Sequence, residues 1–230
     1  MAKRDLKMAK RVSVTQAVRD EVGFDFSVQD SIARGYANVS ALARVLKPRV
    51  EERTGGKAGE QGIVTALKRL SGAYAPAPRG FGRVIAESVV SVRTHVSRLS
   101  VEKTRRSLQT VGALLASHHT EFIQVSESAS AITLVFDQRL HEGVRKALAG
   151  AEVLEEGEEC AAITVQSPEE IITTPGCISA FYDQLSRRRV NVEDTVSCYT
   201  DTIMVVSTRD AGRAFEALTE LIEEESRRSA

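Results

Sequence analysis

The sequence has few of the residues that build disulfide-linked or metal-held scaffolds. Its 230 residues include three cysteines, no tryptophan and 5% aromatic residues. Cys160, Cys177 and Cys198 are too few and too scattered for a disulfide framework or a C-x-x-C metal site. No apolar run reaches the roughly 18 residues needed to cross a bilayer. The sparse aromatic residues also give no support for stacking on single-stranded nucleic acid.

Signals for export and for common cofactors are missing as well. The basic start, MAKRDLKMAK, is not followed by the apolar segment of a secretory signal. Gly55-Gly56-Lys57-Ala58 lacks the spacing of a phosphate-binding loop, and His118-His119 lacks an H-E-x-x-H pattern. We therefore expect a soluble cytoplasmic protein that holds no metal and no cofactor and does not contact a membrane.

The charge is balanced over the whole chain but not locally. Residues 1–83 contain 16 Lys and Arg against 8 Asp and Glu, a net charge of +8, and the remainder carries −8. Such asymmetry indicates segments with different functions. A basic N-terminal module favours a polyanionic partner, because phosphate neutralisation dominates nucleic-acid affinity. The alternative is a solvated surface rich in Lys and Arg.

The N-terminal segment has the apolar spacing of short helices with glycine-rich breaks. Apolar stripes occur within Val14–Val22, Val28–Ile32, Val39–Leu46 and Ile63–Leu70. Ser27 and Asn38 are expected to cap the second and third helices, and Pro48 is expected to end or kink the third. Three or four short helices joined by tight turns are typical of a helix-turn-helix domain, here residues 1–75.

Two groups of polar residues on these helices are candidate DNA contacts. The first group would face the phosphate backbone, and the second would lie on a helix that enters the major groove. The groups are Ser40, Arg44 and Lys47, followed by Thr65, Lys68 and Arg69. Both are equally compatible with the polar faces of an interaction bundle, so double-stranded DNA and a protein partner both remain open.

The rest of the chain contains an internal repeat. The stretch GAYAPAPRGFG precedes it and is too rich in Gly and Pro for a helix interior, so residues 76–93 are expected to form a linker with an extra strand. Beyond it, Ile132-Thr-Leu-Val matches Ile203-Met-Val-Val, about seventy residues later. Each copy has the order βαββα, which a fourth strand would complete to a ferredoxin-like βαββαβ sandwich. The expected fold class is α+β, with an all-α domain followed by sandwiches over residues 94–160 and 161–230.

The second copy carries motifs that resemble an ACT domain, the small-molecule-sensing module at the regulatory end of aspartate kinases. These motifs are Thr174-Pro-Gly-Cys-Ile, Leu185-Ser-Arg-Arg-Arg-Val-Asn-Val and Thr202-Ile-Met-Val-Val. The whole arrangement resembles archaeal ACT proteins that are similar to aspartate kinases. The resemblance implies interleaved units, so we expect Val84–Val101 to supply the strand that the second copy lacks. The first copy has no Pro-Gly turn.

A ligand site is expected where the first strand of the second copy turns into its helix. Free N–H groups at that helix start, with the helix dipole, attract a carboxylate. Asn191 is expected to open the next strand and to bond an amino acid at the interface of paired units. The candidate ligand residues are Thr173, Thr174, Pro175, Gly176, Cys177, Ile178, Asn191 and Val192. The alternative is an ordinary turn and a tolerant loop residue.

Two functions follow from the resemblance, and neither is enzymatic, because no kinase catalytic lobe fits in this length. In the first, a homodimer formed through the ACT domains senses a small amino acid and controls a DNA-binding N-terminal domain. In the second, the chain is a stand-alone regulatory subunit of an amino-acid biosynthetic enzyme such as aspartate kinase.

Overall fold

A computed structural model describes residues 12–74 and 80–229 of the chain. The chain divides into two compact units, Met1–Ala77 and Pro78–Ala230, which we call the helical unit and the α/β unit and describe separately. Within the described residues, no helix is long and apolar enough to cross a membrane.

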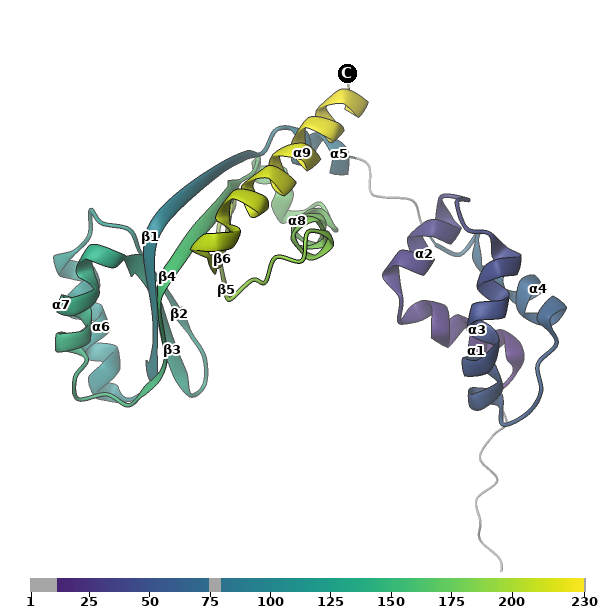
Figure 1. The fold of residues 1–230 in the computed structure, drawn as a ribbon, viewed down its shortest axis with the longest axis horizontal. Coiled ribbons are helices and arrows are strands. Elements are labelled where there is room, and N and C mark those ends of the chain that lie inside the picture. The colour runs from purple at the N-terminus through teal and green to yellow at the C-terminus, as the bar shows by residue number, and fades with distance from the viewer. Residues whose placement is uncertain (1–11, 75–79, 230) are drawn as a thin grey trace, which may run out of the picture. The chain divides into compact units, whose positions relative to one another are not determined.

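The helical unit is built from helices that pack around one apolar core (Figure 1). Its α4 contacts both α1 and α3, and the buried side chains include Val18, Leu46 and Leu67. Within each helix the buried apolar positions recur every three or four residues, as Ile63, Leu67 and Leu70 do in α4, which the sequence predicted. The helices are α1 (Val14–Gly23), α2 (Phe26–Ala33), α3 (Val39–Thr54) and α4 (Glu60–Leu70).

The helix caps agree with the sequence at one site and differ at another. Asn38 caps α3, where its side-chain oxygen accepts a hydrogen bond from the Ala41 N–H at 3.0 Å. The expected cap at Ser27 is wrong, because α2 begins after Asp25, whose carboxylate accepts from the Val28 N–H at 3.1 Å. Both residue types are good caps, so composition alone did not separate them.

Of the two effects expected of Pro48, ending the helix or kinking it, the first does not occur. The helix continues to Thr54, with Pro48 on its exposed side. Leu46 and Val50 remain buried on the opposite side, so core packing spans the proline. The Arg44 carbonyl, which cannot bond to a proline nitrogen, lies on an exposed turn, where water can satisfy it. Val45, expected in the apolar stripe, is 71% exposed.

The α/β unit contains a six-stranded antiparallel sheet with the order β2-β3-β1-β4-β6-β5. The strands are β1 (Val89–Glu102), β2 (Ile123–Glu127), β3 (Ala131–Asp137), β4 (Val153–Gln166), β5 (Asp194–Cys198) and β6 (Asp201–Ser207). The helices are α5 (Phe81–Ala86), α6 (Arg105–Ser117), α7 (His141–Ala147), α8 (Cys177–Arg187) and α9 (Ala211–Ser229), with short 3₁₀ helices η1 (Gln138–Leu140), η2 (Glu169–Ile172) and η3 (Thr208–Asp210).

Two long strands are shared by both βαββαβ units. The later part of β1 pairs with β3, whereas its earlier part, from Val89 to Arg93, pairs with the end of β4. The first βαββαβ unit therefore runs β1-α6-β2-β3-α7-β4, and the second runs β4-α8-β5-β6-α9 and is completed by the start of β1. The strand expected within Val84–Val101 is β1 and completes the second unit, but it begins at Val89, because Val84 and Ile85 belong to helix α5. The boundary expected between residues 160 and 161 lies inside β4, because this strand serves both units.

Each βαββαβ unit has its own core on the helix-covered side of the sheet. Phe136 packs with α6 and α7 in the first unit, and Phe181 packs with Met204 and α9 in the second. A third cluster, which includes Val96, Cys160 and Val205, lies on the opposite face and joins the two units. In Figure 1 the long β1 and β4 ribbons run together from one unit into the other. The two βαββαβ units are therefore one continuous structure.

Candidate functional site

The loop between β4 and α8 is the candidate ligand site, and its last residue is in a conformation that favours glycine. After β4 ends at Gln166, the chain forms η2 and reaches Gly176 with φ +93°. L side chains rarely adopt this left-handed region, so the backbone favours glycine at this position. Gly176 is the N-cap of α8 and has no side chain to cap it. The first amides of the helix are therefore left for other partners.

The hydroxyl groups of the two threonines in this loop are bonded to the backbone of the loop itself. The Thr174 hydroxyl donates to the Glu170 carbonyl oxygen at 2.8 Å, and the Thr173 hydroxyl donates to the same oxygen at 3.4 Å. Because η2 presents this carbonyl to them, their hydrogens are used within the loop. Their oxygens can still accept hydrogen bonds, so they suit an ammonium group better than a carboxylate.

Cys177 and Ile178 open α8 with different surroundings. Cys177 is fully buried in the second core, and burial raises the pKa of its thiol. It therefore packs as a small apolar residue, and the lower pKa that a helix start can produce does not occur. Ile178 is 42% exposed and gives the entrance to this site an apolar edge.

Asn191 and Val192 lie between α8 and β5. Val192 packs against the second core, which also contains Cys177, and Asn191 is exposed. Asn191 lies three residues before β5 and does not open the strand as expected. Among the described residues, no hydrogen bond joins Asn191 to residues 173–178. The structure thus places the loop residues together and leaves Asn191 outside their hydrogen bonds.

The sequence analysis missed α5, which lies against this loop. A Cβ atom built on Gly176 would be 3.7 Å from Cε2 of Phe81, and the Arg83 guanidinium is 3.7 Å from the Glu170 carboxylate. Next to α5, the buried Ser88 hydroxyl donates to Ser167 Oγ at 2.9 Å. The signal was the spacing of Phe81, Val84 and Ile85, which two flanking glycines obscured.

The equivalent turn in the first βαββαβ unit is closed by its own side chains. Thr104 and Ser107 form a capping box at the start of α6, with the Ser107 N–H donating to Thr104 Oγ1 at 3.1 Å. Only Lys103 and Thr104 separate β1 from α6. This turn has no left-handed glycine, and its capping box bonds the Thr104 and Ser107 amides, in agreement with the missing Pro-Gly pair.

A charged cluster lies on the helix-free face near the junction of the two units. The Arg98 guanidinium makes two hydrogen bonds to the Glu155 carboxylate, at 2.6 and 2.7 Å, and these bonds lower the pKa of Glu155. Glu193 lies 4.0 Å from Arg98. Nearby, burial raises the pKa of the Cys160 thiol to about 11. The paired charges and the protonated thiol indicate a structural role.

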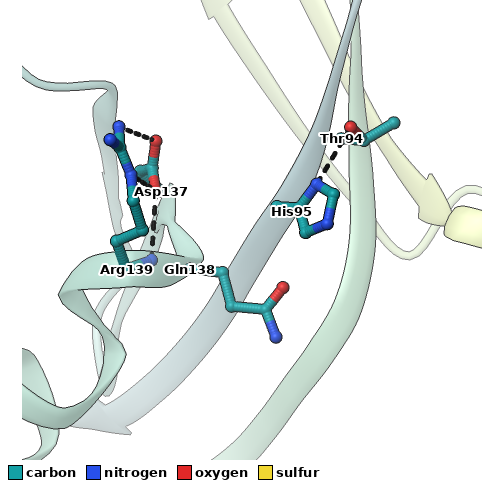
Figure 2. A pocket seen from close by; sticks show the side chains of 5 residues that line it. All are labelled: Thr94, His95, Asp137, Gln138 and Arg139. Carbon is teal, nitrogen blue, oxygen red and sulfur yellow. Dashed lines mark hydrogen bonds and ion pairs between the residues drawn. The ribbon is translucent and has the colours of Figure 1, made fainter.

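A pocket of about 570 Å³ lies beside the bend of β1 (Figure 2). Figure 2 shows the Asp137–Arg139 pair at one end, Thr94 and His95 at the other, and Gln138 between them. Asp137 accepts from Arg139 Nε at 2.9 Å and from Nη2 at 2.8 Å. The Arg139 side chain lowers the pKa of Asp137 to about 2. No residue of this pocket was singled out from the sequence.

The candidate DNA-contacting residues occupy exposed positions on two helices. Thr65, Lys68 and Arg69 are exposed on α4, and Ser40 and Arg44 are exposed on α3, where Lys47 is half-buried. The Thr65 hydroxyl donates to the Gln61 carbonyl oxygen at 2.8 Å, and Arg44 lies 3.7 Å from Glu60. Of these side chains, Thr65 and Arg44 thus have partners in the helical unit.

No metal centre is indicated in the parts of the chain that the structure describes. Among residues 12–74 and 80–229, no group of three or more His, Cys, Asp and Glu side chains is placed to hold an ion. The three cysteines carry free thiols.

Comparisons with known proteins identify the fold of the α/β unit. No protein-family model and no curated protein match the sequence. A solved structure of aspartokinase alpha and beta subunits is 10% identical, covering 58% of this chain and 97% of that one with a TM-score of 0.50. Aspartate kinase of Clostridium acetobutylicum is 14% identical, covering 58% of this chain and 34% of that one with a TM-score of 0.51. The regulatory subunit of aspartate kinase from Thermus thermophilus is 11% identical, over 57% of this chain and 95% of that chain, with a TM-score of 0.49.

At these identities the likeness establishes the fold. The α/β unit has the architecture of the ACT pair in the regulatory region of aspartate kinases, as the sequence motifs predicted. The helical unit precedes it in the chain.

Proposed function

We propose that this protein is a non-catalytic regulator whose ACT pair binds a small amino acid and controls DNA binding by the helical unit. The observation that supports this most directly is the uncapped, glycine-turned start of α8 in the second ACT unit. It differs from the self-capped turn of the first unit at the same point of the fold.

The chemistry of the loop suits an amino acid zwitterion. The open amides at the start of α8 and the helix dipole favour the carboxylate. The oxygens of Thr173 and Thr174 can accept from the ammonium group, and Ile178 offers apolar contact to a side chain. In this proposal Pro175 and Gly176 shape the turn, Cys177 anchors it in the core, and Asn191 and Val192 contact the ligand from a paired unit in a homodimer.

Helix α5 supports a route from this loop to the helical unit. A Cβ atom built on Gly176 would be in van der Waals contact with the Phe81 ring, and α5 is the first described element of the α/β unit after the linker. A ligand that occupies the loop would change the packing of α5, the helix that follows the linker. Such a ligand shifts the equilibrium between two packing arrangements of α5 only to the extent that it binds one arrangement more tightly than the other.

The charge of the helical unit supports DNA as the partner. The excess of Lys and Arg lies in residues 1–83, and α4 presents Lys68 and Arg69 to solvent. In this proposal Thr65, Lys68 and Arg69 contact the groove while Ser40, Arg44 and Lys47 contact phosphates. The second candidate function, regulatory subunit of an amino-acid biosynthetic enzyme, is favoured by the fold similarity to an aspartate kinase regulatory region.

A thermal-shift screen of the twenty amino acids tests the ligand proposal. A ligand that binds the native state alone raises the melting temperature, by an amount that increases with its concentration over its Kd. Gly176→Val strains the left-handed turn, and Asn191→Ala removes the amide from the paired unit, so both should abolish the shift. Thr104→Ala, at the equivalent turn of the first unit, is the matched control and should preserve it.

A salt titration of DNA binding separates the two functions. Lys47→Ala removes one cation from the proposed phosphate-binding group and should therefore reduce the slope of log K against log salt by about one. DNA binding with that slope change supports the regulator. Absence of DNA binding, together with co-purification of an amino-acid kinase, would support the regulatory subunit instead.

A further inference from the structure

The pocket beside the bend of β1 contains a histidine whose backbone is in the left-handed conformation. His95 has φ +57° in the middle of β1, between the residues that pair with β4 in different registers. Glycine adopts this conformation without cost, whereas a residue with a Cβ costs roughly 1 kcal/mol or more. A bend alone would therefore favour glycine. The histidine ring, which is 3.2 Å from Thr94 Oγ1 through Nδ1, is placed at the pocket instead.

The donors around this pocket exceed the acceptors. Asp137 is the one carboxylate among the lining residues, and it already receives the Arg139 Nε and Nη2 hydrogens and the Arg139 backbone N–H. Arg93 adds a second cation 3.9 Å from Asp137, while it stacks 4.9 Å over the Phe122 ring. Two guanidinium groups therefore face Asp137, and the nearby Glu121 carboxylate also attracts the Arg139 guanidinium.

Several of these donors have no partner in the described chain. Within residues 12–74 and 80–229, Arg139 Nη1 and the Gln138 amide make no hydrogen bond, and the Arg139 side chain is 83% exposed. Figure 2 shows the Arg139 guanidinium turned toward Asp137 and the Gln138 side chain extending on the side of the pocket where His95 lies. Guanidinium, amide and imidazole donors around one space match the oxygens of a small anion.

We propose that the pocket lined by Thr94, His95, Gln138 and Arg139 binds a small oxyanion, a carboxylate or a phosphate. The anion is held by Arg139 Nη1 and the Gln138 amide on η1 and by the His95 ring on β1. It therefore joins the start of α7 to the bend at which β1 passes from one ACT unit to the other. This site is distinct from the amino-acid loop before α8 and does not depend on it.

The second ACT unit supplies a matched control. By the repeat, Asp137-Gln138-Arg139 corresponds to Ser207-Thr208-Arg209, since both segments end the strand next to the shared pair and start a 3₁₀ helix. Gln138→Glu places a negative charge in the pocket, whereas Thr208→Glu adds the same charge at the equivalent position. The global charge change is thus identical in the two variants.

The test is a titration of the full chain with inorganic phosphate and, separately, succinate, against potassium chloride at equal ionic strength. The four histidines allow the ring proton signals to be followed one by one by NMR. We expect a saturable shift of the His95 signal with at least one of the two anions and none with chloride. Gln138→Glu should weaken this binding by about tenfold or more, and Thr208→Glu by less than about twofold.

His95→Asn provides an independent arm, because asparagine tolerates the left-handed backbone and lacks the ring. Thermal stabilisation by the binding anion should fall in this variant while the unliganded melting temperature stays close to that of the wild type. The proposal is overturned if neither anion shifts His95 or if Gln138→Glu and Thr208→Glu weaken binding equally. Loss of amino-acid binding in Gly176→Val with unchanged anion binding would separate this site from the proposed sensing loop.

Discussion

The two ACT units have the same order of elements but differ in chemistry at equivalent turns. In the first unit, β1 passes to α6 through Lys103 and Thr104, and a capping box satisfies the amides of Thr104 and Ser107. In the second, residues 167–176 intervene, and an uncapped glycine leaves those amides open. The comparison shows that both units keep the same order of elements, whereas the turns that connect those elements differ in length and in hydrogen bonding.

The turns that follow β3 and β6 also differ, and here the first unit carries the polar feature that the second unit lacks. Where β3 ends, the first unit has Asp137, Gln138 and Arg139 around a pocket. Where β6 ends, the second unit has Ser207, Thr208 and Arg209, with no carboxylate at the first position. Each unit therefore carries one polar feature that its counterpart lacks, although β1 and β4 run through both.

The largest expected effect comes from removing one core aromatic residue from either unit. Phe136→Ala and Phe181→Ala each leave a cavity in a fully buried site, and each should lower the free energy of unfolding by about 3–5 kcal/mol. Because β1 and β4 belong to both units, we expect each substitution to reduce protection in both. Hydrogen exchange of β2 and β5, measured for each variant, checks this expectation.

Phe215→Ala serves as the control, because Phe215 is 40% exposed on α9 and its truncation should reduce stability less. Unchanged protection of β5 in Phe136→Ala would show that the units unfold separately in spite of their shared strands.

A smaller effect is expected from Asp137, with a defined pH dependence. Asp137→Asn removes the charged partner of Arg139 and should lower stability at pH 7 by about 1–3 kcal/mol, whereas Ser207→Ala at the equivalent position should change it by less. The folded-state pKa of Asp137 is lowered to about 2. Its contribution is therefore fully present above the unfolded value near 4 and is lost as the pH falls from about 4 to about 2.

Urea titrations of both proteins across this range measure the difference. The stability gap between wild type and Asp137→Asn should close as the pH approaches 2. A gap that stays constant from pH 7 to pH 2 would mean that the Asp137 charge does not stabilise the first unit.

The capping box should produce an effect of about 1 kcal/mol. Thr104→Ala removes the side-chain acceptor for the Ser107 N–H at the start of α6. Thr110→Ala is the matched control, since it makes the same change within the same helix, where alanine is favourable. Chemical denaturation of the two variants should place Thr104→Ala below the wild type and Thr110→Ala at or above it. The reverse order would show that the first turn is not held by its cap.

Much of the scaffold was predictable from the sequence because it depends on periodicity. Apolar residues alternate before Val101, and the sequence around Ile132 is repeated at Ile203, so both patterns predict strands. The strand shared by the two units was expected because the second copy lacks a fourth strand and resembles interleaved ACT units. Pro48 does not end α3 because the cost of a proline is local, while Leu46 and Val50 are buried on the far side of the helix. Burial of several side chains outweighs one missing hydrogen bond.

The polar detail of the sites was less predictable, because it depends on backbone conformation. The turn at Gly176 could be inferred, since Pro-Gly is a turn signal. The 3₁₀ helix that brings the Glu170 carbonyl to Thr173 and Thr174 gives no comparable signal. Likewise, the left-handed His95 is an ordinary residue in the sequence, and its pocket emerges only when β3 is placed beside β1.

The smallest expected effect, a difference in thiol labelling, sharpens the comparison without altering stability. Cys177 at the start of α8 is buried with a raised pKa, and Cys160 on the helix-free face is buried with a pKa of about 11, whereas Cys198 at the end of β5 is exposed. Because the thiolate is the reactive form, Cys198 should react with a thiol reagent at pH 7.5 much faster than the other two. Peptide mass spectrometry of the folded protein identifies the labelled residue, and urea-unfolded protein is the control in which all three should react. Fast labelling of folded Cys177 would show that its thiol becomes accessible to solvent. The turn before α8 would then not be held in the core by Cys177, contrary to the comparison made above.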